Sequence, residues 1–188
     1  MLVGTRARGL CLVDSGKKRV LTERIKLLLL ETKRKILAIT FTNKAGEEMK
    51  ERLAETPGIN EKVFIGTFHG FCEHVLNNHG KLIGFDEMPH IFEDETDRLR
   101  LSLQAIKESP YYLKLFKDRK TKDQSKFLSN VLRFISDVKR ELLSDKDLFE
   151  ETDDAELVSL YKSYQDILSS QNAIDFDDLL MLTYNLFI

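Results

Sequence analysis

The chain has 188 residues, of which 42% are hydrophobic and 32% are charged, and its net charge is −2. This length allows one large domain or two small ones. No apolar run is long enough to span a membrane. The N-terminus has arginines but no uninterrupted apolar segment, which argues against a secretory signal. Two cysteines are too few for a disulfide framework or a zinc site. We therefore expect a cytoplasmic protein with no membrane partner.

The charge is unevenly distributed along the chain. Residues 1–80 hold 14 Lys and Arg against 9 Asp and Glu, whereas residues 81–188 hold 15 against 22. A basic front half gives mild support for an anionic ligand in that half.

The first predicted element is a helix after Ser15-Gly16-Lys17-Lys18. A Gly-Lys pair at a strand-to-helix turn is the centre of a phosphate-binding loop, in which backbone N–H groups and the lysine contact phosphates. The full pattern G-x-x-x-x-G-K-[ST] would require glycine at Cys11 and a hydroxyl at position 18. Lys18 supplies no magnesium-binding hydroxyl, and Asp14 places a negative charge where phosphates would lie.

The next predicted unit runs from Ile36 to Leu53. Its apolar start predicts a strand buried on both faces, which continues through Phe41 into an amphipathic helix with Asn43 as N-cap. Hydroxyls, an amide, a cation and a ring at such a corner suit a nucleic-acid strand, because the polar groups can hold phosphates while the ring stacks on a base. The alternative is that Phe41 is core and Thr42-Asn43 only cap the helix.

A second corner of the same design follows. Residues 63–72 again predict a strand, then Thr67-Phe68-His69, then a helix over Phe71–His79. A lone histidine is most often a cap or core residue, but at this strand end we expect it to contact a nucleic-acid backbone. The segments ITFTNKAGEEMKERL and GTFHGFC closely resemble two DNA-contacting motifs of the UvrD/Rep/PcrA-type superfamily 1 DNA helicases.

This resemblance extends from about Ser15 to the C-terminus and implies an α/β fold, a partial P-loop RecA-like parallel sheet with helices. It implies ATP with Mg²⁺ as cofactor, and single-stranded DNA, a duplex junction and repair or replication proteins as partners. The implied ATP-binding residues are Ser15, Gly16, Lys17, Lys18 and Arg19. The implied DNA-binding residues are Phe41, Thr42, Asn43, Lys44, Thr67, Phe68 and His69.

The start of the chain departs from the family pattern. The family has glycines at the positions of Leu12 and Asp14 and an adenine-reading glutamine segment upstream, and neither is found here. RVLTERI nevertheless closely resembles the family's helix after the phosphate loop. Our hypothesis is that residues 1–14 are a damaged, mis-started or foreign replacement of the native beginning.

From Glu93 onward the periodicity is helical and predicts three or more packed amphipathic helices. In the resembling family an all-helical subdomain is inserted here, so the predicted domains are 1–92 (partial RecA-like domain), 93–172 (helical insertion) and 173–188 (return to the core). Six Lys and Arg between Lys114 and Lys126 predict a solvated face, with a duplex-facing patch as the less favoured alternative. In Ile174–Leu180 we expect no metal, with Asp175 as a helix cap and Phe176, Leu179 and Leu180 packed.

Two components of the family's motor are not found in these 188 residues: the strand ending in Asp-Glu and the arginine finger. We therefore expect the N-terminal portion of an ATP-dependent 3′→5′ DNA helicase or translocase, with this chain alone inactive as an enzyme. The alternative is a non-catalytic DNA-binding or partner-docking relic of that fold. A third class, an unrelated P-loop kinase or GTPase, is disfavoured by the two Thr-Phe corners. The oligomeric state is left open.

Overall fold

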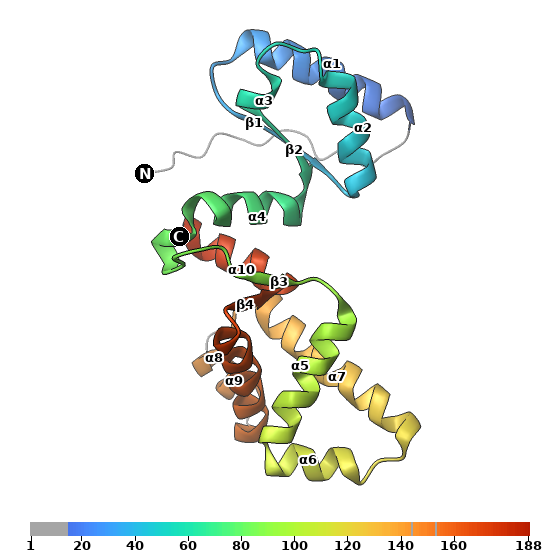
Figure 1. Cartoon of the computed structure of the whole chain (residues 1–188), viewed down its shortest axis with the longest axis vertical. Coiled ribbons are helices and arrows are strands. Elements are labelled where there is room, and N and C mark those ends of the chain that lie inside the picture. The colour runs from blue at the N-terminus through green and yellow to red at the C-terminus, as the bar shows by residue number, and fades with distance from the viewer. Residues whose placement is uncertain (1–14, 144, 153) are drawn as a thin grey trace. The chain divides into compact units, whose positions relative to one another are not determined.

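The computed structural model describes residues 15–143, 145–152 and 154–188, and these form ten α-helices, one short 3-10 helix and four β-strands (Figure 1). Residues 1–14, where the sequence predicts a replaced phosphate loop, lie outside the described residues. The chain divides into two compact units, Met1–Phe71 and Cys72–Ile188. The mostly helical fold with two small parallel sheets agrees with an α/β class.

The first unit is a small β-α-β arrangement. Its elements are α1 (Ser15–Glu31), β1 (Ile36–Thr40), α2 (Asn43–Leu53), α3 (Ile59–Lys62), β2 (Val63–Thr67) and the first turn of α4 (Phe68–His79). β1 and β2 pair in parallel, from Ile36 opposite Val63 to Thr40 opposite Thr67. Helices α1, α2 and α3 cover one face of this sheet with a core of Ile25, Leu29, Met49, Leu53, Ile59 and Ile65.

The other face of the sheet differs from the sequence prediction. We expected the first strand to be buried on both faces, but Leu37 is 48% and Ile39 is 40% exposed. The packed residues Ile36 and Ala38 alternate with them, so only one face of β1 contacts the helices. On the open face Phe64 lies over Gly66, where a Cβ would come within 3.1 Å of its ring.

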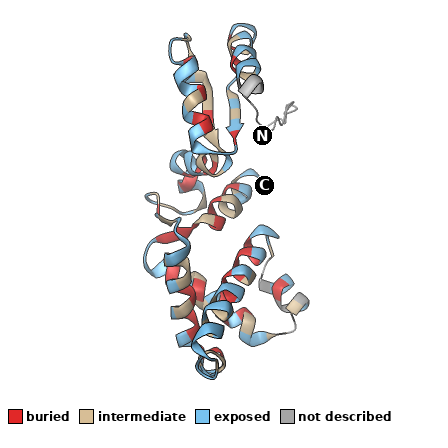
Figure 2. Ribbon diagram, turned by 90° about the vertical axis from the view of Figure 1, so that its right-hand side faces the viewer, coloured by how far each residue is buried: buried red, intermediate tan, exposed pale blue. Residues whose placement is uncertain are grey.

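The second unit contains the helical region that the periodicity predicts. Its helices are α5 (Glu95–Glu108), α6 (Pro110–Lys117), α7 (Thr121–Arg140), α8 (Asp145–Thr152) and α9 (Ala155–Ser170). They share one apolar core that includes Ile106, Ile135, Leu160 and Tyr164. In Figure 2 the buried residues lie mainly on the helix sides that meet neighbouring elements, and the outer sides are exposed.

The second unit also contains five elements outside the helical bundle. They are the rest of α4, the 3-10 helix η1 (Gly80–Ile83), β3 (His90–Phe92), β4 (Ala173–Asp175) and α10 (Phe176–Phe187). β3 and β4 pair in parallel, with His90 opposite Ala173. Cys72 and Leu76 of α4 pack against Ile174 and Leu179 in a second core. The predicted packing of Leu179 is confirmed.

Within the residues that the structure describes, none of the helices combines the length and the apolar character needed to cross a bilayer.

Candidate nucleic-acid interface

The first corner is fixed by three hydrogen bonds to Thr42. Its Oγ1 accepts from the backbone N–H of Ala45 at 3.2 Å, so Thr42 is the N-cap of α2. Its carbonyl oxygen accepts from Oγ1 of Thr40 at 3.0 Å and from the N–H of Gly46 at 3.1 Å. The prediction that Asn43 is the cap is therefore wrong. Asn43 is the first residue of α2, with an exposed side chain that is not used to cap the helix.

Two residues that the sequence prediction did not include bring α2 close to the sheet. A Cβ on Gly46 would lie 3.3 Å from Oγ1 of Thr40 and 3.5 Å from Cα of Gly66. Glycine at position 46 therefore lets the start of α2 lie directly against β2. The signal in the sequence was a glycine inside an amphipathic helix, which often marks a close approach.

The second corner repeats this design. Oγ1 of Thr67 accepts from the N–H of Gly70 at 3.1 Å, and helix α4 begins at Phe68, three residues earlier than predicted. A threonine hydroxyl thus satisfies a free N–H group in the first turn of α4, as Thr42 does in α2.

The pairing of β1 with β2 places the two corners side by side. Thr40 lies opposite Thr67, so Phe41 and Phe68 each follow one member of the same residue pair at one end of a parallel sheet. Phe41 is 86% exposed and Phe68 is 53% exposed. The alternative prediction, that Phe41 is a core residue, is therefore wrong for the described structure. The first corner also exposes Thr42, Asn43 and Lys44, while Thr67 and His69 are half-buried.

The predicted ATP-binding residues lie on a different element. Ser15, Gly16, Lys17 and Lys18 form the first turn of α1, and their side chains lie outside the described residues. The side chain of Arg19 is exposed on the same helix. A helix start is a suitable place for phosphate, but a lysine at position 18 is a cation and cannot ligate magnesium. The residues present therefore do not fit a complete magnesium–phosphate site.

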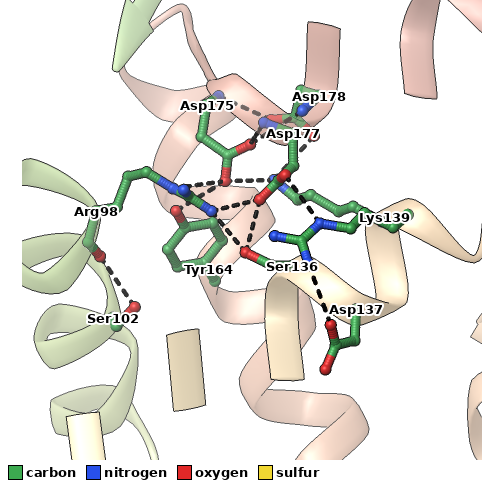
Figure 3. Close-up of polar contacts among 10 residues, drawn as sticks. Arg98, Ser102, Ser136, Asp137, Lys139, Tyr164, Asp175, Asp177 and Asp178 are labelled. Atoms are coloured by element: carbon green, nitrogen blue, oxygen red, sulfur yellow. Dashed lines mark hydrogen bonds and ion pairs between the residues drawn. The ribbon is translucent and has the colours of Figure 1, made fainter. Parts of the chain in front are cut away.

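The carboxylates of the return segment are held by cations from α5 and α7 and by a tyrosine hydroxyl from α9 (Figure 3). Nζ of Lys139 lies 2.8 Å from Oδ2 of Asp175 and 2.8 Å from Oδ1 of Asp178. Nη2 of Arg98 lies 2.5 Å from Oδ2 of Asp177, and the hydroxyl of Tyr164 donates to Asp175 at 2.9 Å. Neutralisation by lysine and arginine makes this cluster an ion-pair network.

Asp175 also caps α10, as predicted. Its Oδ1 accepts from the N–H groups of Asp177 and Asp178, while Oδ2 of Asp178 accepts from the N–H of Asp175. Burial alone would raise the pKa of the Asp175 carboxyl, but its ion pairs with Lys139 and Arg98 outweigh burial and hold that pKa below its ordinary value. For Asp178 burial prevails and raises the pKa of the carboxyl.

No group of three or more His, Cys, Asp or Glu side chains in the described parts of the chain is arranged to hold a metal ion.

The corner geometry and the sequence together define a class of protein. The model of the UvrD/REP helicase N-terminal domain family matches residues 14–188, and the chain belongs to this family. The resemblance inferred from the two corners, and its extent along the chain, are confirmed.

Individual relatives are DNA helicases by name. The chain is 38% identical over 180 residues to the ATP-dependent DNA helicase PcrA of Staphylococcus epidermidis, and 37% identical over 180 residues to the PcrA of Staphylococcus aureus. It is 37% identical over 180 residues to a probable DNA helicase II homolog of Mycoplasma capricolum. Each match covers 92% of this chain but only 23% or 24% of the relative, so the chain spans about a quarter of the length of these curated relatives.

Proposed function

We propose that this chain is the N-terminal portion of an ATP-dependent 3′→5′ DNA helicase or translocase, and that single-stranded DNA binds across the end of β1 and β2. The observation that carries this proposal is the pair of Thr-Phe corners. Thr40 and Thr67 lie opposite each other at the ends of β1 and β2, and the phenylalanine that follows each of them, Phe41 or Phe68, is exposed. Family membership and the names of the relatives, which are DNA helicases, support it independently.

The two corners offer both kinds of contact that single-stranded DNA needs. The rings of Phe41 and Phe68 can stack on bases of any sequence, because every base has a flat face. Asn43, Lys44 and His69 can contact the phosphates, which position the strand without reading its sequence. The side chains of Thr42 and Thr67 are already engaged as caps, so their role is to hold the corners in shape.

The remaining expectations belong to the same proposal. The first unit would be part of a RecA-like domain, with residues 93–172 as a helical insertion and 173–188 as the return segment. Gly16, Lys17 and Arg19 would contact nucleotide phosphates, but no catalytic step is assigned to a site in which Lys18 replaces the magnesium-binding hydroxyl. DNA-repair or replication proteins would be its partners, in the cytoplasm.

The substitution at position 18 favours a second candidate, a DNA-binding relic of the fold without catalysis. Both candidates predict DNA binding at the corners, so binding does not separate them. A measurement of DNA-stimulated ATP hydrolysis by the whole protein from the same gene separates them. Hydrolysis would support the helicase, and its absence would support the relic.

The interface is tested by the Phe41→Ala variant. We expect unfolding by urea to be nearly unchanged, since the side chain is largely exposed, while affinity for a single strand falls by about 1–3 kcal/mol for one lost stack. The loss should be similar for strands of different base composition. Leu30→Ala is the matched control, because Leu30 is also 86% exposed but lies on α1.

Both measurements belong on the same protein sample at low salt. A loss of stability of about 3–5 kcal/mol, with binding per folded molecule unchanged, would show that Phe41 is a core residue and that this corner does not bind DNA.

A further inference from the structure

The two Thr-Phe corners differ in what holds their helices. Helix α2, which follows the first corner, packs through Met49 into the core that it shares with Ile65 of β2. The buried residues of α4, Cys72 and Leu76, belong to a different core, which they share with Leu179 of α10. The helix of the second corner is therefore supported by a part of the chain that is distant in sequence.

Helix α4 links the second corner to that core without a break. It runs from Phe68 to His79, and each of its turns is hydrogen-bonded to the next. Phe68, Cys72 and Leu76 are spaced by four residues, so they lie on one face of the helix. Phe68 is 53% exposed, whereas Cys72 and Leu76 are 1% and 2% exposed. The exposed ring of the corner is thus the first member of the stripe that holds the helix in place.

Helix α10 is a firm support for α4. Leu179 and Thr183 are buried, and Oγ1 of Thr183 donates to the carbonyl oxygen of Cys72 at 3.5 Å. The start of α10 is capped by Asp175, whose carboxylate pairs with the buried Lys139. A helix that is fixed at its start and packed along one face holds the side chains that it presents to a neighbour in place.

We propose that Leu179 and Thr183 are positioning residues for the binding of single-stranded DNA, because they hold α4 and, through it, the ring of Phe68. The inference rests on the proposed function, which makes Phe68 a stacking platform. A ring adds affinity only where it meets the face of a base, so a small tilt of its helix lowers affinity without removing any group that touches DNA. Phe41 does not depend on this support, because the helix after it packs on the sheet.

The test compares single-strand affinity at low salt, measured per folded molecule on the whole 188-residue chain. Leu179→Ala should weaken binding by a factor of about 2–30, the range for residues that act on a site without touching its ligand. Thr183→Ala is a smaller change and should give a smaller loss in the same direction. Leu179→Met keeps the side-chain volume and should bind like the unmodified chain.

A matched control separates positioning from general loss of packing. Ile106 is fully buried in the core of the helical bundle, so Ile106→Ala also leaves a cavity, but in a different core from that of Cys72 and Leu76. This variant should be less stable, with the affinity of the folded protein unchanged.

Combination with each phenylalanine variant identifies the ring that is moved. Added to Phe68→Ala, Leu179→Ala should cost less than a further factor of about two, because the ring that it displaces is already absent. Added to Phe41→Ala, it should cost its full factor, because the two changes act on separate rings.

Three results would overturn the inference: undiminished affinity of folded Leu179→Ala, an equal loss in Ile106→Ala, or a loss that adds in full to that of Phe68→Ala. If Leu179→Ala does not fold, Thr183→Ala takes its place in the same comparisons, and undiminished affinity there overturns the inference. If both phenylalanine variants weaken binding while Leu179→Ala does not, only the positioning role fails. If neither phenylalanine variant weakens binding, or the unmodified chain binds no single strand, the proposed function fails as well.

Discussion

At the scale of single residues, the interface depends on which side chain caps α2. Thr42 and not Asn43 accepts the hydrogen bond from Ala45, so the two neighbours have separate tasks. Thr42→Ala should lower the free energy of unfolding by about 0.5–2 kcal/mol, the usual cost of a lost N-cap. Asn43→Ala should change stability by no more than about 0.5 kcal/mol.

In DNA binding the order of the two variants should be reversed, with the larger direct loss of affinity in Asn43→Ala. If Asn43 contacts phosphate, Asn43→Ala weakens single-strand binding at unchanged stability, which urea unfolding and a binding titration on one sample can measure. Equal losses of stability in the two variants would show that the helix is capped by either side chain.

At the scale of elements, the return segment is held to the helical bundle by buried charge. Lys139 is fully buried with Asp175 and Asp178, so its removal would leave Asp178 without a cation and Asp175 with only the more distant Arg98, 3.8 Å away. Lys139→Met should cost about 3–5 kcal/mol in chemical unfolding. Lys146→Met is the control, because the exposed Lys146 lies 3.7 Å from Glu150 and its loss should cost no more than about 0.5 kcal/mol.

A double variant tests the reason for that cost. Lys139→Met/Asp175→Asn should recover part of the lost stability, because one unpaired charge is removed with the lysine. No recovery at all would mean that the packing of the lysine stem, and not its charge, holds this position.

Within this network, the contribution of Asp175 to stability depends on pH in a defined direction. The pKa of Asp175 is lower in the folded state than in the unfolded chain, where it is about 3.9. Its contribution is therefore fully present above about pH 4 and is lost as the pH falls through the lower folded value. The difference in unfolding free energy between the unmodified chain and Asp175→Asn should be constant from neutral pH to about pH 5 and shrink below pH 4. A difference that grows on acidification would contradict the ion pairing of Asp175.

The elements that could be predicted from sequence are those with a local signal. The strands at Ile36–Thr40 and Val63–Thr67, the bundle helices and the Asp175 cap all follow from periodicity or capping residues close in sequence. Whether nucleic acid and ATP bind at the predicted residues is not tested and stays a prediction.

The network around Lys139 could not be predicted, because it joins Arg98, Lys139 and Asp175 from distant parts of the chain, with no local pattern. The open face of β1 was also missed, because an apolar run does not reveal how many of its faces will be covered.

At the scale of the whole molecule, the chain alone should not hydrolyse ATP. Lys18 supplies no magnesium ligand, and positioned charges are the main source of catalysis in phosphoryl transfer. Purified 188-residue protein should release no phosphate above background, with or without single-stranded DNA, and Lys18→Thr should not restore turnover. DNA-stimulated phosphate release by the unmodified chain would contradict this prediction.

The parallel pairing of β1 and β2 has a consequence for the direction of a bound strand. Strands that pair in parallel run in the same direction, so both corners lead from a strand end to a helix start in the same direction, although the ring precedes the capping threonine at Phe41–Thr42 and follows it at Thr67–Phe68. A nucleic-acid strand is itself a polymer with a direction, whose units repeat by translation along its backbone. Under the proposed binding, a DNA strand that crosses both corners would meet two strand-to-helix transitions that run in the same direction, so its two orientations would not be equivalent on this surface.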